Sequence, residues 1–242
     1  MTTKPHPKRT AAELIALYPP NEEPLPDAMI QEPYITDSLY LARDHLRERS
    51  DVLMSSNTFI YYEEGNRRAC VAPDWYVAFG VDPATIREVE SYLLWEVGKP
   101  PDFVLEVASP STWANDLGWK RDLYARIGVR EYWRYDPRGG ELYGEALVGE
   151  ELVDGAYRRL EMGRTEEGVT WGRSAVLGLD IHWGEEQVEF VDTATGEPLR
   201  RIHEERLARE AAEARADAEQ ARADAAEAEL SRLRAELRRQ EL

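Results

Sequence analysis

A five-residue run, Phe103–Val107, constrains the fold of this chain more than any other feature. Apart from the carboxylate of Glu106 it is entirely apolar, and such a run is typical of a central strand that is covered on both faces. A helix is predicted next over 112–127, with Ser and Thr residues available to cap its start and Gly128 placed to cap its end. A second strand is predicted over 131–135. We therefore expect a mixed α/β domain built around a sheet.

Further elements are expected on both sides of this unit. β-Branched and aromatic residues predict strands over 58–62, 75–79 and 92–96, and glycine-punctuated hairpins are expected over 138–199. A helical pattern begins at Thr36, with Asp37 as its N-cap. The Pro-rich segment 1–35 is predicted to be an N-terminal arm, mostly extended, with room for a short helix around 11–17.

The segment 200–242 has a different composition, with no Gly, Pro or aromatic residue. Its apolar residues recur at steps of four and three, with one small register shift: Leu207, Ala211, Ala214, Ala218, Ala221, Ala225 and Ala228, then Ala226, Leu230, Leu233 and Leu237. This pattern predicts a coiled-coil helix that pairs with itself or with a partner. The alternative is a lone, solvated helix. The chain thus divides into an arm (1–35), a folded domain (36–199) and this tail.

The charge of the chain argues against broad, non-specific affinity for DNA. The net charge is −17, and the segment 200–242, with 10 basic and 11 acidic residues, contributes only −1 of it. The remaining −16 repels a phosphate backbone, although a local basic lining or a bound divalent cation could reverse the field in one cleft.

The single cysteine, Cys70, fits a reducing cytoplasm. Neither a signal peptide nor a membrane-spanning segment is expected.

Two carboxylates are candidates for a functional site. Asp74 follows Pro73 and begins a strand, and Glu106 lies within the apolar strand. A carboxylate in that position costs free energy unless it is paired or binds a metal. Structural alternatives remain open for both, because Asp74 could be a turn residue and Glu106 could pair with an arginine.

Lys120 is the third candidate. Five residues of the predicted helix share one face at steps of four and three, and the middle one is the lysine: Trp113, Leu117, Lys120, Tyr124 and Ile127. The chain has 26 Arg and only 4 Lys, and Lys99 and Lys120 are the two that follow the predicted arm. A lysine in the centre of an apolar face should point toward the sheet. The alternatives are that Lys120 reaches the surface or pairs with Asp116 one turn earlier.

Asp74, Glu106 and Lys120 together predict a site for a divalent cation. Mg²⁺ prefers oxygen ligands and keeps several waters, so two carboxylates and a backbone carbonyl suffice to hold it. Cleavage of a phosphodiester needs a deprotonated water and neutralisation of the phosphate charge, to which an ammonium can contribute.

The order Asp74, Glu106, lysine resembles that of the PD-(D/E)xK nuclease superfamily. More narrowly, the segments 101–112, 116–120 and 128–133 resemble the signature of the Uma2 family, and the likeness extends over roughly 36–190. It implies a restriction-endonuclease-like core, in which a mixed sheet is flanked by helices, and Mg²⁺ or Mn²⁺ bound by Asp74 and Glu106.

The sequence departs from the superfamily pattern at Ala108, where the superfamily has its lysine. In the Uma2 family this lysine lies on the following helix, and Lys120 matches that place. The superfamily often has a further acidic residue on an early helix, for which Asp44 and Glu48 are both candidates.

Two functions are therefore expected. The first is a Mg²⁺-dependent endonuclease that acts on DNA. The second is a catalytically weak, nuclease-derived binding or assembly module that works through its coiled-coil tail. A different kind of hydrolase has little support, because the chain has no Gly-x-Ser-x-Gly or P-loop motif and its four histidines are not spaced as metal ligands.

Overall fold

The computed structural model describes residues 9–19, 28–185, 187–200 and 222, and the chain divides into two compact units, Met1–Leu199 and Arg200–Leu242. The predicted coiled-coil tail lies, apart from Arg200 and Arg222, outside the described residues. The predicted boundaries of the arm, the domain and the tail stay predictions. None of the described helices has the length and apolar character needed to cross a membrane.

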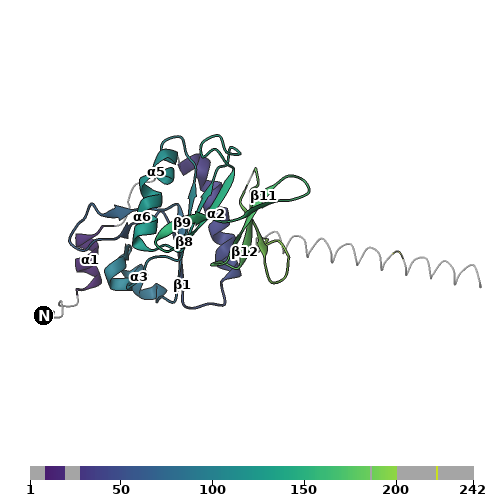
Figure 1. The fold of residues 1–242 in the computed structure, drawn as a ribbon. Coiled ribbons are helices and arrows are strands. Elements are labelled where there is room, and N and C mark those ends of the chain that lie inside the picture. The colour runs from purple at the N-terminus through teal and green to yellow at the C-terminus, as the bar shows by residue number, and fades with distance from the viewer. Residues whose placement is uncertain (1–8, 20–27, 186, 201–221, 223–242) are drawn as a thin grey trace, which may run out of the picture. The chain divides into compact units, whose positions relative to one another are not determined.

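The described part of the first unit begins with two helices, mixes strands and helices through its middle, and ends with a run of strands (Figure 1). The helices are α1 (Ala11–Leu17), α2 (Ala28–His45), α3 (Pro83–Val89), α4 (Leu94–Val97), α5 (Trp113–Leu117) and α6 (Trp119–Ile127). The strands are β1 (Val52–Ser56), β2 (Ile60–Tyr61), β3 (Cys70–Val71), β4 (Trp75–Phe79), β5 (Tyr92–Leu93), β6 (Phe103–Val107), β7 (Glu131–Tyr135), β8 (Leu147–Val153), β9 (Ala156–Arg159), β10 (Met162–Arg164), β11 (Thr170–Ser174), β12 (Leu179–His182) and β13 (Glu189–Asp192).

A six-stranded sheet in the order β1-β4-β6-β7-β8-β9 forms the centre of the unit. Its two middle strands, β6 and β7, are parallel, and its other neighbouring pairs are antiparallel. A four-stranded antiparallel sheet (β10-β11-β12-β13) and a small sheet of three short strands (β3-β2-β5) complete it. The prediction of a mixed α/β domain with a mixed sheet is therefore confirmed.

The six-stranded sheet is covered on both faces, as the apolar run of β6 predicts. Because successive side chains of a strand point to opposite faces, Phe103 and Leu105 lie on one side, where they pack with α2 and with the four-stranded sheet. Val104 lies on the other side and packs with Leu123 and Tyr124 of α6. Glu106 follows the same alternation as Val104, so the fold directs its side chain toward α6.

Three of the predicted strands, 75–79, 103–107 and 131–135, have the predicted bounds. Two others are shorter than predicted. The strand predicted over 58–62 is reduced to β2, and the one predicted over 92–96 ends at Leu93, where α4 begins. Strand β1 and helix α3 were not predicted.

The start of α2 was predicted wrongly. The helix begins at Ala28 instead of Thr36, so it contains Pro33, and Asp37 lies in its interior instead of at its N-cap. Packing accounts for the difference. Ile35 and Leu39 lie one turn apart in the core, and burial of this face stabilises a helix that the local sequence alone does not favour.

The single helix predicted over 112–127 is also wrong, because the structure breaks it at Gly118. Helix α5 ends at Leu117 and α6 begins at Trp119, and Gly118 between them has φ −109° and ψ −110°, outside the helical range. A Cβ atom on Gly118 would lie 3.1 Å from the carbonyl oxygen of Ala114, so the tight turn favours glycine. The break turns Trp113 and Leu117 out to solvent, while Tyr124 stays in the core.

Candidate functional site

Asp74 and Glu106 lie side by side because β4 and β6 are antiparallel neighbours. Trp75 is paired with Leu105, so Asp74, immediately before β4, lies next to the end of β6. The backbone N–H of Asp74 donates to Oε2 of Glu106 at 3.2 Å, and the backbone N–H of Val107 donates to Oδ2 of Asp74 at 2.6 Å. Each carboxylate thus contacts the strand that carries the other, which orients both.

Lys120 reaches the same place from α6. Its Nζ lies 3.0 Å from Oε1 of Glu106, and the hydroxyl of Tyr124, one turn further along α6, donates to that same oxygen at 2.6 Å. The lysine side chain is 12% exposed and that of Glu106 only 1%. The structure therefore brings all three sequence-predicted residues together, and the prediction that Lys120 points toward the sheet is confirmed.

Asp116 is a fourth charged member of this cluster, which the sequence suggested only as an alternative partner of Lys120. Nζ of Lys120 lies 2.9 Å from Oδ1 of Asp116, so Lys120 forms ion pairs with Glu106 and with Asp116 at the same time. Oδ2 of Asp116 accepts a hydrogen bond of 2.7 Å from Tyr143, and its backbone carbonyl accepts one of 2.9 Å from Tyr132. Tyr143 comes from a distant loop, and nothing in the sequence pointed to it.

The early-helix acids considered from the sequence are elsewhere. Asp44 and Glu48 both pair with Arg47 on the surface, and none of the described contacts joins them to Asp74 or Glu106. The residue of α2 that does reach this region is Gln31, whose buried side-chain amide donates to the backbone carbonyl of Val107.

Lys99, the other lysine beyond the arm, is not part of the site. Its ammonium lies 2.6 Å from Asp102 and donates to the carbonyl of Phe79 at 2.8 Å, near the opposite end of β6 from Glu106. Its contacts tie two strand ends together, which is a structural role.

Burial dominates the electrostatics of the carboxylates. It raises the pKa of Asp74 to about 6 and that of Glu106 to about 8, because an ionised carboxylate loses its hydration there, and Lys120 only partly opposes the rise. Burial by itself would lower the pKa of Lys120. The neighbouring carboxylates Glu106, Asp116 and Asp74 reverse this and hold the pKa above its ordinary value, so the ammonium stays charged.

Asp74 and Glu106 are the residues of this cluster that could serve as ligands of a divalent cation. Asp74, Glu106 and Asp116 are all buried, and among the described ion pairs Lys120 is the only cation that contacts any of them, through Glu106 and Asp116. Full ionisation of the three carboxylates therefore leaves two negative charges unbalanced. The described residues contain no cluster of three His, Cys, Asp or Glu side chains arranged to hold a metal. The side-chain ligands here would be two carboxylates, Asp74 and Glu106, with water completing the shell, as Mg²⁺ commonly accepts.

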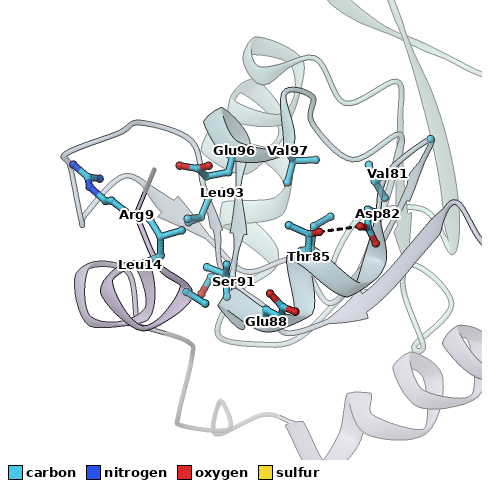
Figure 2. Close-up of a pocket in the computed structure, with 14 residues that line it drawn as sticks. Arg9, Leu14, Val81, Asp82, Thr85, Glu88, Ser91, Leu93, Glu96 and Val97 are labelled. Atoms are coloured by element: carbon cyan, nitrogen blue, oxygen red, sulfur yellow. Dashed lines mark hydrogen bonds between the residues drawn. The ribbon is translucent and has the colours of Figure 1, made fainter. Parts of the chain in front are cut away.

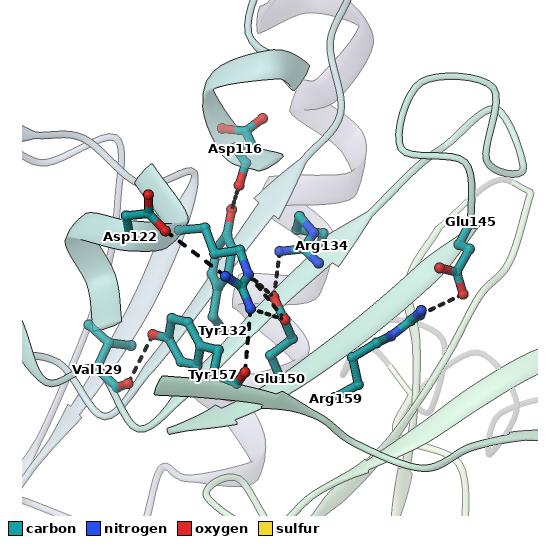
Figure 3. A network of polar contacts seen from close by, with 10 residues as sticks. Asp116, Asp122, Val129, Tyr132, Arg134, Glu145, Glu150, Tyr157 and Arg159 are labelled. Carbon is teal, nitrogen blue, oxygen red and sulfur yellow. Dashed lines mark hydrogen bonds and ion pairs between the residues drawn. The ribbon is translucent and has the colours of Figure 1, made fainter. Parts of the chain in front are cut away.

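A second buried charge cluster lies on the same face of the sheet (Figure 3). Glu150 of β8 accepts hydrogen bonds from Arg121 at 2.7 Å and from Arg134 at 2.7 Å. The side chains of Glu150 and Arg134 are 4% and 7% exposed. Arg134 is paired in register with Glu106 on the parallel neighbour strand, so the two clusters are adjacent.

A pocket of about 370 Å³ lies apart from these clusters, between the α1 region and α3 (Figure 2). Leu14, Ile86 and Leu93 contribute apolar side chains to its wall. Its Asp82 caps the start of α3, accepting hydrogen bonds from Ala84 and Thr85. None of the three predicted site residues lines it.

Comparison with known proteins matches the chain to a family model and to four chains of solved structures. The model of the Uma2 family, described as a putative restriction endonuclease, matches residues 31–182. This range includes Asp74, Glu106, Asp116 and Lys120, which we call the carboxylate–lysine cluster. Among solved structures, a similar one is the crystal structure of a putative nuclease belonging to DUF820 from Anabaena variabilis ATCC 29413. It has 10% sequence identity and a TM-score of 0.42, over 60% of this chain and 76% of that chain. No curated protein matches.

Proposed function

The chain belongs to the Uma2 family, and on this premise we propose that it is an endonuclease that hydrolyses phosphodiester bonds of DNA with the help of Mg²⁺ or Mn²⁺. The observation that carries the proposal is the convergence of Asp74, Glu106 and Lys120 within one buried cluster. We also propose that the six-stranded sheet, with α2 and α6 on its two faces, is a restriction-endonuclease-like core.

In this proposal each residue has a separate role. Asp74 and Glu106 would hold the cation, which when bound activates water and neutralises charge on the phosphate. Lys120 stays protonated and donates to a phosphate oxygen or orients the attacking water. Asp116 holds the ammonium of Lys120, and Tyr143 in turn holds Asp116, so the lysine keeps a carboxylate partner when Glu106 binds a cation.

We expect the purified chain to nick or cut plasmid DNA with Mg²⁺ or Mn²⁺ and not with EDTA. Asp74→Ala should lower the rate about a hundredfold or more, because a metal ion contributes several kcal/mol to transition-state stabilisation. Asp122→Ala is the matched control, since Asp122 is an exposed aspartate on α6, and it should cut at the wild-type rate.

Equal rates for wild type and Asp74→Ala would contradict the catalytic proposal. The alternative, a catalytically weak binding or assembly module, would then be tested by titrating Mg²⁺ into both proteins in a calorimeter.

We propose in addition that the segment 200–242 pairs as a coiled coil with a second copy of the chain. The full chain should sediment as a dimer or larger species, and a truncation after Leu199 as a monomer. A monomer mass for both proteins would contradict self-association.

A further inference from the structure

The two carboxylate oxygens of Glu106 have different partners. Oε1 accepts a hydrogen bond of 2.6 Å from the hydroxyl of Tyr124 and lies 3.0 Å from Nζ of Lys120, so two donors from α6 meet at it. Among the described hydrogen bonds, Oε2 accepts only that of the backbone N–H of Asp74, at a longer 3.2 Å. Each carboxylate oxygen has two lone pairs. Both acceptor positions of Oε1 are therefore engaged, whereas Oε2 keeps one for a further ligand.

Asp74 likewise has one engaged oxygen and one that is not. Its Oδ2 accepts the backbone N–H of Val107 at 2.6 Å, and no described hydrogen bond or ion pair reaches its Oδ1. Asp74 and Glu106 thus each hold one oxygen firmly against the protein. One oxygen of each carboxylate remains available to a cation, which commonly binds to proteins through one or two carboxylates.

The position of the Tyr124 hydroxyl is fixed by the packing of its ring. Tyr124 is fully buried with Val104 and Leu123, and its ring centroid lies 5.2 Å from that of Tyr132. The hydroxyl oxygen lies on the axis about which a tyrosine ring turns, so a ring flip does not move it. Burial and the charge of Glu106 both raise the pKa of Tyr124 well above its ordinary value, so the hydroxyl keeps its proton and stays a donor.

Tyr124 differs from its buried neighbours in what it holds. Tyr157 donates to the backbone carbonyl of Val129 at 2.9 Å (Figure 3). A backbone carbonyl in a folded chain has a fixed direction, whereas a side-chain carboxylate rotates about its last bond. A hydroxyl that donates to a carboxylate therefore removes a freedom that the fold alone leaves open.

Lys120 cannot do this in place of Tyr124. Its ammonium is shared between Glu106 and Asp116, and in the proposed function it also donates to a phosphate oxygen or orients the attacking water. The hydroxyl of Tyr124 has a single donor hydrogen and one described acceptor, Oε1 of Glu106. Tyr124 is therefore the donor that stays on Oε1 when Lys120 turns to the substrate.

We propose that Tyr124 is a positioning residue, whose hydroxyl keeps Oε1 of Glu106 turned toward α6 so that Oε2 is presented to the cation shared with Asp74. This inference rests on the proposed function for the cation. Without the hydroxyl the carboxylate samples several orientations, and binding must select one of them. Hydrogen-bond partners of metal ligands typically contribute 10–100-fold to metal affinity or activity.

The first test measures metal binding in the absence of DNA. Mn²⁺ is titrated calorimetrically into the full chain and into two variants. Tyr124→Phe should bind Mn²⁺ at least about tenfold more weakly than wild type. Tyr157→Phe is the matched control, because its ring also packs against Tyr132, at 5.8 Å, and it also loses a buried hydroxyl. It should bind Mn²⁺ as wild type does. Urea unfolding of both variants verifies that each is folded.

The second test separates positioning from a general loss of structure. Plasmid cleavage is followed as a function of Mg²⁺ concentration. In Tyr124→Phe the concentration that gives the half-maximal rate should rise about tenfold, while the rate at saturating Mg²⁺ stays close to that of wild type. The reason is that an interaction of equal strength in the ground state and the transition state changes binding and not the maximal rate. A smaller fraction of folded protein would instead lower the maximal rate and leave the half-maximal concentration unchanged.

The inference is overturned if Tyr124→Phe binds Mn²⁺ as tightly as wild type or more tightly, or if Tyr157→Phe loses as much affinity. Mn²⁺ binding that depends on Tyr124, in a chain that cuts no DNA, would contradict the nuclease proposal and support the positioning role. Cleavage of DNA by the wild type, with unchanged Mn²⁺ affinity in Tyr124→Phe, would do the reverse.

Discussion

Lys120→Met should lower the rate of plasmid cleavage by about 10²–10³-fold, the usual cost of removing one preorganised group that stabilises transition-state charge. Methionine fills nearly the same volume as lysine but carries no charge. The substitution leaves Glu106 and Asp116 without their ammonium, which in the structure lies 3.0 and 2.9 Å from them. The initial rate of nicking in Mg²⁺ measures the effect.

Lys99→Met provides the matched control, because Lys99 is the other lysine in the described residues and pairs with Asp102 near the far end of β6. It should cut at close to the wild-type rate.

Loss of Lys120 also leaves buried carboxylates unpaired and could impair folding, so Lys120→Arg is a second variant that keeps the charge. We expect it to fold and still to lose at least about tenfold in rate, because the broader guanidinium does not fit a position made for an ammonium. Wild-type rates for both Lys120 variants would rule out a catalytic role for this residue.

Glu150→Ala is expected to have the largest effect on stability of any single substitution in the charge clusters. Burial would raise the pKa of Glu150, but Arg121 and Arg134 hold it below its ordinary value, so the carboxylate is ionised in the folded protein. Its removal leaves the buried guanidinium of Arg134 without its carboxylate partner, which should lower the free energy of unfolding by about 3–5 kcal/mol. Urea unfolding followed by tryptophan fluorescence reports on this unit, because all seven tryptophans precede residue 200.

An exposed ion pair in the same region serves as the control. Glu145 contacts Arg159 at 2.6 Å, but both side chains are about half exposed, at 51% and 54% (Figure 3). Glu145→Ala should therefore cost less than about 1 kcal/mol. The double variant Glu150→Leu/Arg134→Met removes both charges and should recover most of the stability lost in Glu150→Ala. A loss for Glu150→Ala no greater than that for Glu145→Ala would contradict this account.

The two buried charge clusters differ in the balance of their charges and in the direction in which the pKa values of their carboxylates shift. In the Glu150 cluster, two guanidinium groups compensate one carboxylate, and the pKa of Glu150 falls. Around Lys120, one ammonium faces three carboxylates, and the pKa values of Asp74 and Glu106 rise. An arrangement that opposes ionisation lowers stability, and such costs are expected where a site is shaped for binding and not for folding.

Local patterns were sufficient to predict the central elements of the fold. Strands β4, β6 and β7 were predicted with correct bounds because each is a short run rich in apolar or aromatic residues, although β6 contains Glu106 and β7 contains Glu131 and Arg134. Periodicity failed at Gly118, since the spacing of large apolar residues continues across the break. It also failed at the start of α2, where Pro33 suggested an arm but packing of the helix against the sheet favours a longer helix.

The candidate site was predictable to a different degree for each residue. Glu106 and Lys120 stood out because each interrupts an apolar pattern, and the structure places them in contact. Asp116 was visible only as a possible partner of Lys120. Tyr143, which contacts Asp116 from a loop 27 residues away in the chain, carried no signal in the sequence.

The sequence by itself determined the central strands, the Uma2 resemblance and the three residues Asp74, Glu106 and Lys120, because apolar patterning and motif order are local properties. Only the tertiary structure decided that Lys120 bridges Glu106 and Asp116, and that Trp113 and Leu117 face solvent. The physical reason is that burial and ion pairing depend on which elements pack against each other. Across the turn at Gly118, Lys120 is buried in the domain, whereas Trp113 and Trp119 are exposed.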